Sequence, residues 1–102
     1  MNPIEQNMET IKTLCDRYRV SKLFAFGSVL TEKFNPESDI DLVVDFDNVG
    51  IDKYADNYFD FKFSLQDAFH RNVDLLEEKA ISNPYMRQSI DLSKRLIYAK
   101  WY

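Results

Sequence analysis

Residues 24–46, FAFGSVLTEKFNPESDIDLVVDF, decide the fold of this chain. An apolar segment ends at Gly27-Ser28, a short helical turn and an Asn-Pro-Glu-Ser turn follow, and the chain re-enters as a strand carrying Asp39 and Asp41. Side chains of a strand alternate between faces, so residues 40, 42, 44 and 46 form one apolar face that should pack against helices. Asp39 and Asp41 share the opposite face.

This arrangement suits a phosphate and a divalent cation held side by side. Two carboxylates about 7 Å apart along a strand can share one or two hard cations, and Mg²⁺ is usually bound by a few carboxylates together with substrate phosphates. Gly27 lets the backbone approach an anion closely, and Ser28 begins a helical turn whose free N–H groups face that anion. A triphosphate fits between the two groups.

The motif carries a family resemblance. Gly27-Ser28, ten intervening residues and then Asp39-Ile40-Asp41 resemble the signature of the nucleotidyltransferase superfamily that includes DNA polymerase beta. The short chain and its Ser-Asp-Ile-Asp-Leu run are most similar to the minimal nucleotidyltransferases, and the similarity extends from the first helix to Tyr98. It implies an α/β fold, a small, twisted, mixed sheet of about four strands covered mainly on one face by helices, like the polymerase beta palm.

The resemblance also implies a site and an activity. Asp39, Asp41 and Asp74 would be the catalytic, metal-binding acids for two Mg²⁺ ions, and Gly27 and Ser28 would hold the β- and γ-phosphates of ATP. Asp74 also stands out by itself, because it interrupts an apolar strand, where an unpaired carboxylate is costly. The alternative is that Asp74 points to solvent from an edge strand. The implied reaction moves AMP from ATP to a protein hydroxyl, a tyrosine of a paired HEPN-type toxin, so that the chain acts as an antitoxin.

One departure from the family pattern leaves alternatives open. Many relatives have a basic residue soon after Gly-Ser, whereas this chain has Val-Leu-Thr-Glu at residues 29–32. Lys33 or Lys22 are candidate substitutes. Besides an active adenylyltransferase, the sequence is compatible with an antitoxin that neutralises its partner by binding alone, and with an interaction domain whose acids are a solvated cluster.

Length and composition narrow the class of protein. The chain has 102 residues, which predicts a single domain over residues 1–102. Its net charge of −4 argues against nucleic acid as the main substrate. Cys15 is the single cysteine, so no disulfide can form within the chain. The first residues do not resemble a signal peptide and no apolar run reaches 18 residues, so we expect a cytoplasmic protein.

Hydrophobic periodicity predicts the remaining elements. We expect helices over residues 3–18, 51–69 and 83–94, and strands over residues 22–26, 73–76 and 96–99. The helix over 51–69 has one apolar stripe at residues 54, 58, 61, 65 and 69 and further aromatic residues around it. This excess predicts either a broad core contact or a protein-binding face, for a toxin or for a homodimer. Trp101-Tyr102 would be a core plug or a contact surface.

Overall fold

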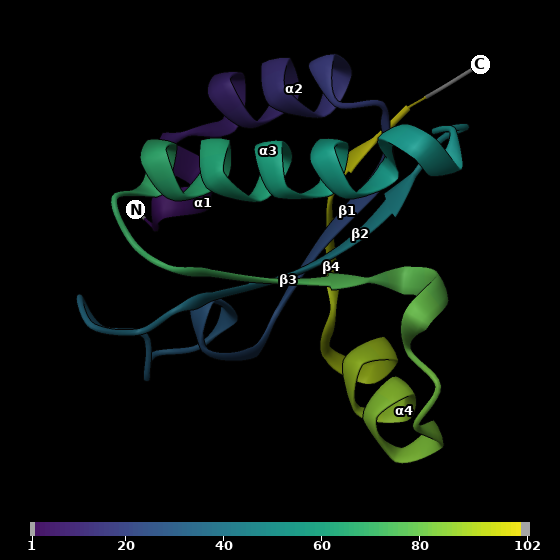
Figure 1. Cartoon of the computed structure of the whole chain (residues 1–102). Helices are drawn as coiled ribbons and strands as arrows, with labels where there is room; N and C mark the ends of the chain where they lie inside the picture. Colours follow the sequence, from purple (N-terminus) through teal and green to yellow (C-terminus); the bar gives the residue numbers. More distant parts are fainter. Residues whose placement is uncertain (1, 101–102) are drawn as a thin grey trace.

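A computed structural model describes residues 2–100 of the chain. Its strands form one sheet, and its α-helices lie on both sides of that sheet (Figure 1). In chain order the elements are α1 (Pro3–Gln6), α2 (Met8–Arg17), β1 (Val20–Phe26), the 3-10 turn η1 (Gly27–Leu30), β2 (Ile40–Phe46), α3 (Ile51–Phe69), β3 (Val73–Glu77), the 3-10 turn η2 (Glu78–Ala80), α4 (Pro84–Ser93) and β4 (Arg95–Ala99). Trp101-Tyr102, predicted as a plug or contact surface, lies outside the described residues.

The sheet is mixed, with the strand order β3-β2-β1-β4. β1 pairs antiparallel with both β2 and β4, whereas β2 and β3 are parallel. Parallel neighbours need a long crossover, and α3 provides it. The predicted four-stranded mixed sheet is therefore confirmed, and the parallel pairing places the starts of β2 and β3 at the same end of the sheet.

One face of the sheet carries the main core. Ile40, Leu42 and Val44 on β2 have no exposed surface, as the alternation along this strand predicts. α2 and α3 lie across this face (Figure 1), and α3 contributes the fully buried Phe61. The Phe61 ring contacts that of Phe46 edge-on, with centroids 5.8 Å apart. The core thus fixes which face of β2 is buried, and leaves Asp41 on the other face.

The second face is covered in part. α4 lies on the side of the sheet opposite α2 and α3 (Figure 1). Ile90 of α4 is buried, and so is Val43, which the alternation of β2 places on the same face as Asp41. The helices therefore lie mainly, but not wholly, on one face.

The N-terminal helix differs from the prediction. A single helix over residues 3–18 was expected, and the structure has α1 and α2 separated by Asn7. The Asn7 side chain donates a hydrogen bond to the carbonyl of Pro3, 2.7 Å away. In a continuous α-helix this carbonyl would accept the backbone N–H of residue 7 instead, so the side chain competes with the helix. The strand expected from residue 22 starts earlier, at Val20, which pairs with Phe46.

Candidate active site

Gly27 is held against Asp41 at the end of β1. Its φ of +74° lies in the left-handed region, which disfavours residues with a side chain. A Cβ atom at Gly27 would lie 2.5 Å from Asp41 Oδ2, a distance that real Cβ atoms do not tolerate. Glycine is therefore required both by the backbone angle and by the close approach to a carboxylate.

Ser28 lies in η1, the predicted helical turn. Its carbonyl accepts hydrogen bonds from the Thr31 backbone N–H at 2.9 Å and from the Thr31 hydroxyl at 3.0 Å. The turn is a single 3-10 turn, and the first N–H groups of such a turn have no partner within it. The Gly-Ser motif thus presents free amides beside the acidic end of the sheet.

Asp41 and Asp74 are neighbours across the sheet. They are direct partners in the parallel register of β2 and β3, and Phe26 is the partner of Asp41 on β1. Neighbouring strands lie about 4.8 Å apart, so paired side chains on the same face stand next to each other. The structure therefore brings together two acids that are 33 positions apart in the chain.

Asp39 adds a third negative charge. It directly precedes β2, and residues two apart share a face. The pKa of Asp41 is raised above 3.8, first by burial and then by the charges of Asp74 and Asp39. The charges of the two other predicted acids therefore act on Asp41 at the start of β2.

These acids fit a magnesium ion chemically. Among residues 2–100, no three His, Cys, Asp or Glu side chains stand close enough together to hold a metal ion as they are placed. Burial first, and then the charges of Asp74 and Asp39, raise the pKa of Asp41, and a bound cation would offset both effects. Mg²⁺ needs only one or two carboxylates when water and phosphate oxygens complete its shell. The adjacent pair Asp41 and Asp74, with Asp39 beside it, supplies oxygen donors of that kind.

Arg71 holds the loop that delivers Asp39, and the sequence did not reveal it. Its Nη1 donates to the carbonyl of Asn35 at 3.1 Å and to that of Ser38 at 3.0 Å. Its guanidinium also lies 4.5 Å from the centre of the Phe34 ring. Because Ser38 directly precedes Asp39, Arg71 fixes the backbone on which this acid is mounted. Backbone acceptors more than 30 residues away leave no pattern in the sequence.

The two lysines proposed as substitutes for the missing basic residue lie in different places. Lys22 pairs with Asp45 and Ala99 in the sheet, near the end of β1 far from Gly27. Lys33 is exposed on the loop after η1, where its backbone N–H bonds the Thr31 hydroxyl. Lys22 is therefore too far along the strand to reach an anion at Gly27-Ser28.

One surface pocket lies beside the acids rather than over them. It measures about 620 Å³ and is lined by η1, the loop after it, Arg71, Arg95 and the start of α1. None of the three acids lines it. Because none of the acids lines this pocket, we take Gly27, Asp41 and Asp74 rather than the pocket as the candidate active site.

Known proteins resemble this chain in sequence. The family model described as "Polymerase beta, Nucleotidyltransferase" matches residues 9–101. A protein of Methanocaldococcus jannaschii named "Putative protein adenylyltransferase" is 36% identical over 87 residues, which are 85% of this chain and 84% of that protein. These similarities cover the motif and nearly all of the sheet.

Solved structures share the fold. A structure described as a putative minimal nucleotidyltransferase superposes with a TM-score of 0.76 at 23% identity, covering 93% of this chain and 95% of that one. A tri-AMPylated Shewanella oneidensis HEPN toxin in complex with an MNT antitoxin gives a TM-score of 0.66 at 18% identity, covering 95% and 73%. Along residues 2–100, no helix is long and apolar enough to span a membrane.

Proposed function

Because this chain belongs to the polymerase beta nucleotidyltransferase family, we propose that it moves AMP from ATP to a hydroxyl group of a partner protein. The observation that carries the proposal is the in-register pair Asp41 and Asp74 beside Gly27. The M. jannaschii relative named as a protein adenylyltransferase supports AMP as the transferred group.

Each site residue has a part in this reaction. The free amides at Gly27 and Ser28 bind phosphate oxygens of ATP, and Asp39, Asp41 and Asp74 would hold Mg²⁺. Mg²⁺, when bound, offsets the charge of the phosphates and of the departing pyrophosphate. Asp74 accepts the proton of the attacking hydroxyl. A bond forms from that oxygen to the α-phosphorus, and the bond from the α-phosphorus to the pyrophosphate oxygen breaks.

The acceptor belongs to a second molecule in this proposal. Asp39 and Asp74 are exposed at one end of the sheet, so a bulky acceptor can approach them. We take the partner to be a HEPN-type toxin and the acceptor to be one of its tyrosines, in line with the AMP-modified HEPN toxin bound to an MNT antitoxin in a protein of the same fold. The chain would then act as an antitoxin inside the cell.

A second function, neutralisation by binding alone, is favoured by one observation. Phe59 and Phe63 on α3 are 47% and 53% exposed, and their rings stack with centroids 6.0 Å apart. Exposed aromatic pairs of this kind are typical of protein-binding surfaces. Occlusion by this surface needs no nucleotide, so the two functions differ in whether the acids matter.

A labelling assay separates them. The protein would be incubated with Mg²⁺, ATP labelled at the α-phosphate and the product of the neighbouring gene, beside the Asp39→Asn/Asp41→Asn double variant. We expect a labelled partner band that the variant does not produce, together with loss of toxin neutralisation. An unlabelled partner in a stable complex, with neutralisation retained by the variant, would reject catalysis in favour of occlusion.

A further inference from the structure

The active site needs a positive charge that the motif does not supply. A triphosphate approaching Asp39, Asp41 and Asp74 meets carboxylates gathered at the start of β2 and β3, and their negative charge repels its phosphates. Residues 29–32, Val-Leu-Thr-Glu, add one more acid and no base. A nucleotide would therefore bind weakly unless another element brings a cation to this face of the sheet.

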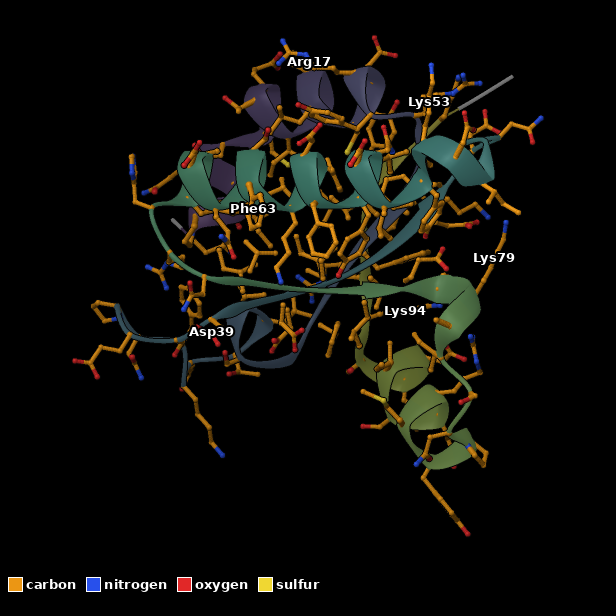
Figure 2. All side chains as sticks on the ribbon, in the orientation of Figure 1. Arg17, Asp39, Lys53, Phe63, Lys79 and Lys94 are labelled. Carbon is orange, nitrogen blue, oxygen red and sulfur yellow. The ribbon has the colours of Figure 1, made fainter. Side chains whose placement is uncertain are left out.

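α4 brings Lys94 there. The Lys94 backbone N–H caps α4 by donating to the Ile90 carbonyl at 2.7 Å. Its Nζ lies 4.4 Å from the centre of the Phe24 ring. The flanking residues Leu23 and Ala25 are buried in the core, so the alternation of β1 places Phe24 on the opposite face, together with Phe26. Figure 2 shows Lys94 on the side of the sheet that α4 occupies.

Lys94 is close to the acids along the sheet. Phe26 is the β1 partner of Asp41, and Phe24 is the next residue of β1 on the same face. Same-face residues of a strand are about 7 Å apart. The ammonium over Phe24 therefore lies one such step along β1 and one strand across from Asp41, and Asp74 lies one strand further, on β3.

The ammonium retains bonding capacity for a phosphate. It forms an ion pair with Asp91 Oδ1, 2.8 Å away, and Asp91 lies three residues earlier at the end of α4. The Lys94 side chain is 23% exposed. A lysine has three N–H donors, and Asp91 accepts one. The Phe24 ring attracts the charge through its face and fixes the side chain over the sheet. Lys94 is thus held in place with donors available.

From these observations we propose that Lys94 binds a phosphate group of the nucleotide and replaces the basic residue missing after Gly27-Ser28. The proposal rests on the proposed nucleotidyltransferase function and adds a binding residue from α4 to it. Lys33 is one competing candidate, because it follows η1 in the chain and is exposed on its loop, and Arg71 and Arg95 line the pocket beside η1. Lys22 serves as a control, because it lies on β1 far from Gly27.

Calorimetric titration with the α,β-methylene analogue of ATP and Mg²⁺ tests it. We expect Lys94→Met to weaken binding at least about tenfold, the loss of one charge-assisted hydrogen bond, and to flatten the salt dependence of Kd. Lys94→Arg should retain most of the affinity, and Lys22→Met should bind as the wild type does. Thermal unfolding of each variant shows that the fold is intact.

The outcomes separate this proposal from the proposed function. Unchanged affinity in Lys94→Met, or a loss confined to Lys33→Met, overturns the role of Lys94 even where AMP transfer occurs and depends on Asp41. Lys94-dependent binding without any AMP transfer supports Lys94 and rejects the proposed reaction. A wild-type protein that does not bind the analogue overturns both.

Discussion

Gly27 is constrained both by its backbone angle and by its contact with Asp41. Its positive φ alone costs a residue with a Cβ about 1–2 kcal/mol, and that Cβ would also displace the Asp41 carboxylate. We expect Gly27→Ala to lower the free energy of unfolding by at least this amount and to abolish AMP transfer. Urea unfolding and the labelling assay measure the two effects.

The other glycine provides the matched control. Gly50 precedes α3 with an ordinary φ of −61°, and a Cβ there would meet only the exposed Asp52 carboxylate, at 2.8 Å. Gly50→Ala should therefore unfold and transfer AMP nearly as the wild type does. Equal behaviour of the two variants would show that Gly27 is not constrained by its contact with Asp41.

Asp41 makes stability depend on pH. Because its pKa is raised in the folded protein, its protonated form favours folding, and this contribution is lost as the pH rises through the raised pKa. Asp41→Asn should thus unfold at higher urea concentration than the wild type at pH 7, and the difference should vanish toward pH 4. Mg²⁺ should stabilise the wild type more than this variant.

Asp91 is the control for this prediction, because its pKa is shifted in the opposite direction. Hydrogen bonding to Lys94 lowers the pKa of Asp91, so the Asp91 charge favours folding above the ordinary pKa of the group. Asp91→Asn should be no more stable than the wild type at pH 7. A gain in both variants would mean that any loss of negative charge stabilises this acidic chain, and that the Asp41 site has no special part.

Residues with local signals were predictable, and those with distant partners were not. Gly27, Ser28, Asp39 and Asp41 lie within one motif, and Asp74 interrupts an apolar strand. The proximity of Asp41 to Asp74 follows from the register of β2 and β3. Arg71 and Lys94 act through an acceptor at Ser38 and a ring at Phe24, and such contacts exist only once the chain is folded. Their roles could not be read from sequence spacing.

At the scale of elements, hydrophobic periodicity predicted a helix correctly where only one side of that helix is buried. α3 runs over Ile51–Phe69 as predicted, because Phe61, Leu65 and Phe69 recur at helical spacing and are buried. The break between α1 and α2 was missed, since the side-chain hydrogen bond of Asn7 competes with the helix without disturbing the apolar pattern. Periodicity places α4 in the chain, but it does not say which face of the sheet α4 covers.

The aromatic excess of α3 is divided between two environments. Phe61 is fully buried, whereas Phe59 and Phe63 are about half exposed, so a broad core contact does not account for the whole helix. The Phe59 ring also contacts Tyr58, with centroids 5.1 Å apart. Figure 2 shows Phe63 below the axis of α3, on the side toward β3. These exposed rings lie on α3, whereas the acids lie at the start of β2 and β3.

At the scale of the whole molecule, this separation predicts that partner binding and nucleotide binding can be lost independently. Phe59→Ser/Phe63→Ser removes two half-exposed rings, so the free energy of unfolding should fall by about 1.5–3 kcal/mol while the fold is kept. Affinity for the ATP analogue should be unchanged. Co-purification with the neighbouring gene product should be lost, because stacked aromatic residues commonly carry most of the binding energy of an interface.

The same variant distinguishes a toxin partner from self-association. Sedimentation of the purified wild-type chain would show whether it is a dimer, and conversion of a dimer to a monomer by Phe59→Ser/Phe63→Ser would assign the surface to a second copy. Retained co-purification would instead direct the search to α4, where Tyr85 and Leu92 are 82% and 81% exposed. Because Lys94 caps that same helix, a partner bound there would contact the element that we expect to hold the nucleotide, and its binding would then depend on ATP.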